Sequence, residues 1–165
     1  MTIKLSISGI EINNFDLIHL ERQVSATLPD AFKDLYLMHN GGVPERDWWD
    51  SEDDFEPIRV KRFKAVAKKD ASDALETKYI GGCYLAMTAR QVIPATILPF
   101  AIDDGGNFFC LDLIDGCVCF FAADIYDADL TASENHLKSY RWLAASFEAF
   151  LSGLKDEDDR FEDGF

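Results

Sequence analysis

Residues 28–42, LPDAFKDLYLMHNGG, spell one short helix together with the signals that begin and end it. Pro29 suits the first helical position, where no intrahelical N–H bond is lost. One helix face takes positions i, i+3, i+4 and i+7, which here are Phe32, Leu35, Tyr36 and His39. Asn40-Gly41-Gly42 can supply the left-handed residue that closes a helix. The segment therefore predicts a helix with one buried face and a sharp exit.

Other helices and a strand are predicted around this segment. Asn13 or Asn14 can cap a helix over residues 15–23. Residues 58–66 predict a strand whose alternation slips at Arg62, which indicates a bulge or an edge. Asp70 or Ser72 can begin a further helical segment, after which we expect a break at Gly81-Gly82.

From Ile97 onward the pattern predicts three strands joined by two turns. Asp115-Gly116 favours a two-residue hairpin turn, in which Leu113 would face Val118. That register gives one wholly apolar face, made of Phe109, Leu111, Leu113, Val118 and Phe120. The opposite face is mixed and carries Cys110, Asp112, Ile114, Cys117, Cys119 and Phe121. The mixed face is either covered by another segment or available to a partner.

Three segments of the chain, taken in order, resemble sequence motifs of the SUKH superfamily, which includes fungal cell-wall-synthesis regulators and bacterial immunity proteins. The segments are residues 28–42 followed by Pro44, residues 97–112 and residues 145–151. The resemblance implies an α+β fold with a mainly antiparallel central sheet and helices packed on one side. We expect a single SUKH-like domain over residues 1–155 and an acidic, flexible tail over residues 156–165.

Length and composition agree with one such domain. The chain has 165 residues, of which 48% are hydrophobic and 13% aromatic, enough for a sizeable core. Its apolar runs are too short to span a membrane, and residues 1–9 alternate like a strand rather than like a secretory signal. We expect a cytoplasmic protein. Its four cysteines do not form a small-protein disulfide framework, so reduced thiols are favoured.

The charge is strongly negative and unevenly distributed. Thirty acidic residues against 16 basic ones give a net charge of −14. Seven acids fall within residues 45–56 and six within residues 156–163, whereas residues 59–69 hold six basic residues and no acid. Such a field repels nucleic acid and attracts a basic protein. The alternative for the acidic tail is that it serves solubility alone.

Motifs for metal binding or catalysis are weak. Cys110, Cys117 and Cys119 share a predicted sheet face with Asp112, yet no Cys-x-x-Cys is present, so half-buried thiols are a better explanation than a zinc site. The three histidines stand alone, and the glycines of residues 103–107 lead into a strand rather than into a phosphate-binding helix. We therefore expect no metal, no cofactor and no enzymatic activity.

Trp48-Trp49 lies within the acidic loop, where an exposed tryptophan with a polar rim is typical of an interface anchor. The alternative is that the loop folds back and one ring covers the core. The resemblance implies an immunity protein that binds a cognate toxin, often a basic nuclease. The predicted partner-binding residues are Trp48, Trp49, Asp50, Glu52, Asp53, Asp54, Asp103 and Asp104. A second hypothesis is a regulatory scaffold of the fungal type.

Overall fold

The computed structural model describes residues 3–51 and 55–157. Its helices are α1 Asn14–Val24, α2 Asp30–Met38, α3 Ile80–Ala89, α4 Ala132–Ser139 and α5 Phe147–Gly153, with a 3-10 turn η1 at Ala123–Ile125. Its strands are β1 Leu5–Ser6, β2 Val43–Pro44, β3 Trp48–Trp49, β4 Ile58–Arg59, β5 Arg62–Phe63, β6 Ile97–Ile102, β7 Phe108–Asp112, β8 Val118–Phe121 and β9 Tyr140–Ala144.

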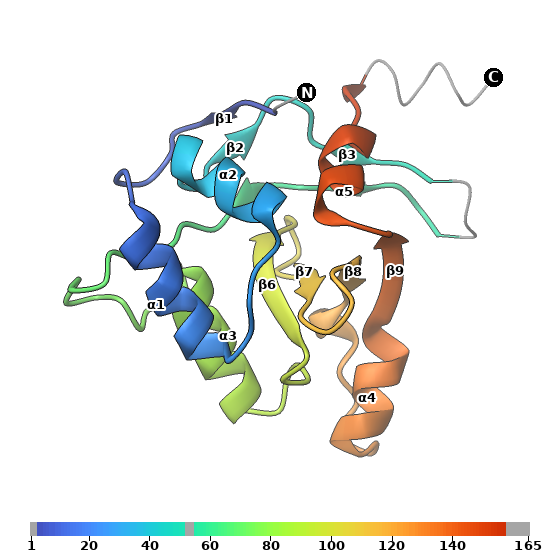
Figure 1. The fold of residues 1–165 in the computed structure, drawn as a ribbon. Helices are drawn as coiled ribbons and strands as arrows, with labels where there is room; N and C mark the ends of the chain where they lie inside the picture. The colour runs from blue at the N-terminus through green and yellow to red at the C-terminus, as the bar shows by residue number, and fades with distance from the viewer. Residues whose placement is uncertain (1–2, 52–54, 158–165) are drawn as a thin grey trace.

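An antiparallel sheet of five strands, in the order β5-β6-β7-β8-β9, forms the centre of the molecule (Figure 1). Helices α2 and α5 cover one face, where Phe32, Phe147 and Phe150 pack around Phe100. On the opposite face, the His136 ring of α4 lies 6.1 Å from that of Phe121. Cys110 points to the same face. Its pKa is raised, mainly by burial and further by the neighbouring thiols of Cys119 and of Cys83, which belongs to α3. The predicted α+β class and antiparallel sheet are confirmed, and helices α3 and α4 reach the second face.

The first two helices follow the predictions from local signals. Asn13 caps α1 by accepting hydrogen bonds from the backbone N–H groups of Phe15 and Asp16, and the Asp16 carboxylate accepts one from the Asn13 N–H. This reciprocal arrangement is a capping box. Helix α2 buries Phe32, Leu35 and Tyr36 as predicted, but Pro29 is its N-cap residue rather than its first helical residue.

The Asn40-Gly41-Gly42 turn joins α2 to the sheet. Gly41 and Gly42 have φ values of +75° and +122°, so the predicted left-handed exit is confirmed. A Cβ atom on Gly42 would lie 2.2 Å from the Ser6 carbonyl oxygen. The buried Asn40 amide donates to the carbonyl oxygens of Ile10 and Val66 and accepts from the Val66 N–H. One side chain therefore fastens two segments that are distant in the sequence.

Two predictions about residues 58–93 are wrong in detail. The strand expected over residues 58–66 is divided, since β4 pairs with β3 and β5 pairs with β6. The helical segment expected from Asp70 or Ser72 is a series of turns, and Gly81-Gly82 is not a break but lies in the first turn of α3. A Cβ atom on Gly81 would lie 2.3 Å from the Gln23 side chain, and one on Gly82 would lie 2.2 Å from the Glu76 carbonyl oxygen. The two glycines permit close packing of α3 against its neighbours.

The β7–β8 hairpin has a longer loop than predicted. The observed pairs are Leu111 with Val118 and Cys110 with Cys119, so the predicted register is wrong by two residues. Residues 113–116 form a four-residue loop, closed by a bond from the Asp112 N–H to the Cys117 carbonyl oxygen. A shift of two leaves every strand side chain on its predicted face. The mixed face is covered in part, because Cys110, Cys119 and Phe121 are buried.

The sequence analysis did not identify α4 and β9, which run directly into each other and complete the sheet (Figure 1). All four cysteines are free and buried. None of the helices in the described ranges is long and apolar enough to cross a membrane.

Candidate partner-binding surface

Strand β3, within the acidic loop (residues 45–56), lies between two backbone pairings. Strand β3 pairs with β4, with Trp48 opposite Arg59. On its other side, Trp48 exchanges two backbone hydrogen bonds with Lys155, of 3.0 and 2.8 Å. The loop therefore lies next to the segment that enters the acidic tail, of which Asp156 and Glu157 are described and residues 158–165 lie outside the described residues.

Trp49 faces the core rather than a partner. Its side chain is only 8% exposed and stacks on the Phe150 ring at a centroid distance of 5.3 Å. The alternative in which one ring covers the core is therefore confirmed for Trp49. Strand alternation directs Trp48 to the opposite side, where it is half-buried. Of the tryptophan pair, Trp48 is the one placed where it can contact a partner.

Arg59 gathers acidic groups from three parts of the chain. Its Nε donates a hydrogen bond of 2.8 Å to Asp47 Oδ2. This bond is the largest cause of a raised Arg59 pKa, and the charges of Asp104 and Glu157 add to it. We call these four residues the Arg59 cluster. Asp47 of the acidic loop is therefore paired with Arg59, and the turn after β6 and the start of the tail lie near enough for their charges to act on it.

The two aspartates of the turn after β6 have different roles. Asp103 accepts hydrogen bonds from the backbone N–H groups of Gly105 and Asn107 and from the Asn107 side chain, at 2.8 to 3.0 Å. These bonds stabilise the turn. Asp104 is exposed and contributes to the Arg59 cluster. Asp50 is half-buried, and the predicted residues Glu52, Asp53 and Asp54 lie outside the described residues.

Arg141 of β9 holds the far end of the acidic loop, a role that the sequence analysis did not predict. Its guanidinium donates to the Glu56 carbonyl oxygen at 3.0 Å and to Ser51 Oγ at 3.4 Å. It also lies over the Phe55 ring, 4.8 Å from the ring centroid. Arg141 is buried, whereas Phe55 is 59% exposed. Phe55 is therefore an aromatic side chain presented to solvent beside the acids.

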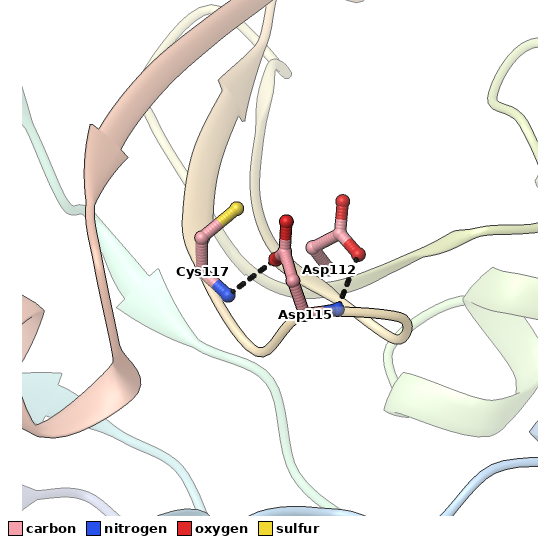
Figure 2. Close-up of side chains that lie close together, drawn as sticks. All are labelled: Asp112, Asp115 and Cys117. Carbon is pink, nitrogen blue, oxygen red and sulfur yellow. Dashed lines mark hydrogen bonds between the residues drawn. The ribbon is translucent and has the colours of Figure 1, made fainter.

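A group of possible metal ligands occurs at the β7–β8 loop, formed by Asp112, Asp115 and Cys117 (Figure 2). One ligand atom from each lies within 4.8 Å of the others. Asp115 accepts from the Cys117 N–H at 2.9 Å, and Asp112 accepts from the N–H groups of Ile114 and Asp115. Burial, followed by the hydrogen bond to Asp115, raises the pKa of Cys117 to about 12. Cys117 is thus a protonated thiol at neutral pH, and this group closes the loop.

The fold and this surface define the class of the protein, which is an α+β domain with an acidic loop anchored by contacts to strands β4 and β9. The chain belongs to the SMI1/KNR4 family (SUKH-1), whose profile matches residues 12–153. It is also similar to the SPbeta prophage-derived uncharacterized protein YokK of Bacillus subtilis (strain 168). The two are 25% identical over 162 residues, which cover 92% of this chain and 80% of the relative.

Proposed function

We propose that this chain is an immunity protein that binds a cognate bacterial toxin and blocks it by occupying its active cleft. The toxin is a basic protein, with a nuclease domain as the leading candidate. The observation that carries the proposal is the joining of the acidic loop, Asp104 and Glu157 at the Arg59 cluster in a chain of net charge −14. Membership of the SUKH-1 family supports it.

Charge explains how such a partner is captured. A nuclease cleft is basic because it binds phosphates, so an acidic surface can take the place of the substrate. Charge complementarity raises association rates by roughly 10- to 1000-fold at low salt. Phe55 and Trp48 supply aromatic area beside the acids, and aromatic groups enclosed by a polar rim are typical hot spots. The hydrogen bonds from Arg141 hold Ser51 and Glu56 in place before binding, which lowers the cost of ordering these two residues.

Co-expression tests the proposal directly. The chain is produced together with the product of the open reading frame next to its gene, and growth and complex formation are measured. We expect growth to be rescued and a stable complex to be recovered. Rescue without a complex, or no rescue of a toxic neighbour, contradicts the proposal.

Charge reversal locates the surface. Asp50→Lys together with Asp104→Lys should slow association about tenfold at low salt and flatten its salt dependence, because rim charges act mainly on the association rate. The matched control is Asp70→Lys with Asp129→Lys, which changes the net charge equally at exposed positions outside this surface. Equal rates for the two double variants would remove the acidic loop from the site.

A further inference from the structure

Three surface hollows follow one another along α2. One lies beside the β7–β8 loop at Asp115 and Gly116, one lies between α2 and α5, and one lies beside β1 and β2. Their volumes are about 360, 320 and 470 Å³. Ala31 and Glu148 line both the first and the second, and Met38 lines both the second and the third. The three hollows are therefore neighbours that share lining residues along α2, and we call them together the α2 groove.

The walls of the α2 groove are acidic. Asp30 and Asp34 come from α2, Glu148 from α5 and Asp115 from the β7–β8 loop, and all four are exposed. Within residues 3–51 and 55–157, none of these four carboxylates forms an ion pair. Asp30 and Asp34 stand at positions i and i+4, where like charges destabilise a helix. The groove thus combines a negative field with carboxylates that have no cationic partner in the described structure.

The third hollow is apolar. Its lining includes Ile3, Leu5, Val43 and Pro44, together with Lys4, His39 and Glu45. Met38 also lines it, with 61% of its surface exposed. A flexible thioether suits an adaptable apolar contact. This end of the groove fits an apolar side chain, whereas the other two hollows fit cations.

The spacing along α2 matches an extended chain. Asp30, Asp34 and Met38 are each four residues apart and form one stripe, with steps of about 6 Å along the helix axis. Alternate side chains of an extended chain are about 6.6–6.8 Å apart and point the same way. Two cationic side chains followed by an apolar one, at every second position, would meet these three residues in order.

We propose that the α2 groove binds an extended basic segment of a partner protein, with Lys or Arg at two alternate positions and an apolar residue at the next alternate position. Charge complementarity selects this occupant, since four carboxylates line the groove of a chain with net charge −14. The inference goes beyond the proposed function, because the groove is distinct from the Arg59 cluster and accepts any partner that carries such a segment.

The test is a peptide titration of the full chain followed by NMR. The probes are the capped peptides Lys-Thr-Lys-Thr-Leu and its reverse, Leu-Thr-Lys-Thr-Lys, because a bound peptide can run along α2 in either direction. The control peptide is Lys-Lys-Thr-Thr-Leu, which has the same charge and composition but the wrong spacing. We expect at least one probe to shift the amide signals of residues 30–38 and 147–151 and to bind about threefold or more tighter than the control.

Variants separate the groove from the overall charge. Asp30→Asn, Asp34→Asn and Glu148→Gln together should weaken binding of the probe by about fivefold or more. Glu11→Gln, Asp70→Asn and Asp129→Asn together change the net charge equally at exposed positions outside the groove and should leave binding nearly unchanged. The proposal is overturned by equal weakening in both triple variants, by equal binding of probe and control peptides, by signal shifts located elsewhere, or by no binding. The peptide readout does not depend on a toxin, so failure here is distinguishable from failure of the proposed function.

Discussion

Asn40 holds the fold together at the junction between α2 and the sheet, and Asn40→Ala tests that role. The substitution removes hydrogen bonds of 2.8 Å to the Ile10 carbonyl oxygen, 2.9 Å to the Val66 carbonyl oxygen and 2.7 Å from the Val66 N–H. Val66 is 3% exposed, so its N–H and carbonyl groups would remain buried without partners. Ile10 is 74% exposed, and its carbonyl can bind water instead.

Each buried polar group left without a partner costs about 1–3 kcal/mol, so the two groups of Val66 together cost about 4 kcal/mol. This is a large part of the 5–15 kcal/mol that stabilises a typical domain. Urea unfolding followed by tryptophan fluorescence measures the loss. With a slope of about 2 kcal/mol per molar urea, we expect the midpoint to fall by about 2 M.

Asn13→Ala is the matched control, because it makes the same chemical change at an exposed position. The Asn13 side chain accepts two backbone hydrogen bonds at the start of α1, and loss of such a cap costs about 1 kcal/mol. Its midpoint should fall by about 0.5 M. If Asn40→Ala lost no more stability than Asn13→Ala, the assignment of Asn40 as the fastener of the junction would be refuted.

Two further predictions concern ionisable groups. Burial on its own would raise the pKa of Asp16, but hydrogen bonds from the Asn13 and Lys69 backbones and the charge of Lys68 lower it from 3.8. A carboxyl group whose pKa is lowered by folding stabilises the protein above pH 3.8, and this stabilisation is lost as the pH falls through the folded-state pKa. The difference in unfolding free energy between the native chain and Asp16→Asn should therefore narrow in acid. A difference that stays constant across pH in urea unfolding would contradict this. Burial, with Asp115, raises the pKa of Cys117 to about 12, so iodoacetamide at pH 8 should modify Cys117 only after unfolding. Mass spectrometry that found rapid modification of native Cys117 would count against the structure of this loop.

Local signals predicted the parts of the fold that are determined locally. The proline, the apolar spacing and the two glycines of residues 28–42 act within a few residues, and the structure confirms the helix and its left-handed exit. The prediction of a break at Gly81-Gly82 was wrong because the role of Gly81 is determined by its close approach to Gln23, which is distant in the sequence. The hairpin register was wrong because bonds to the Asp112 and Asp115 side chains stabilise a four-residue loop.

The candidate surface could be predicted in composition but not in arrangement. Acid-rich segments are visible in the sequence, yet their meeting at Arg59 depends on the β3–β4 pairing and on the turn after β6. Arg141 was missed because its contact with the Glu56 carbonyl joins residues 85 positions apart. Trp49 turned inward because strand alternation separates adjacent side chains.

The central claim is that this chain acts by stoichiometric capture of a basic toxin. The most direct measurement is a titration of the activity of the neighbouring toxin domain with the purified chain. The account predicts that toxin activity falls in proportion to the added chain and reaches zero at about one equivalent, with association that slows as salt is added. Complete inhibition by a small fraction of an equivalent, or full toxin activity in the presence of excess chain, would contradict it.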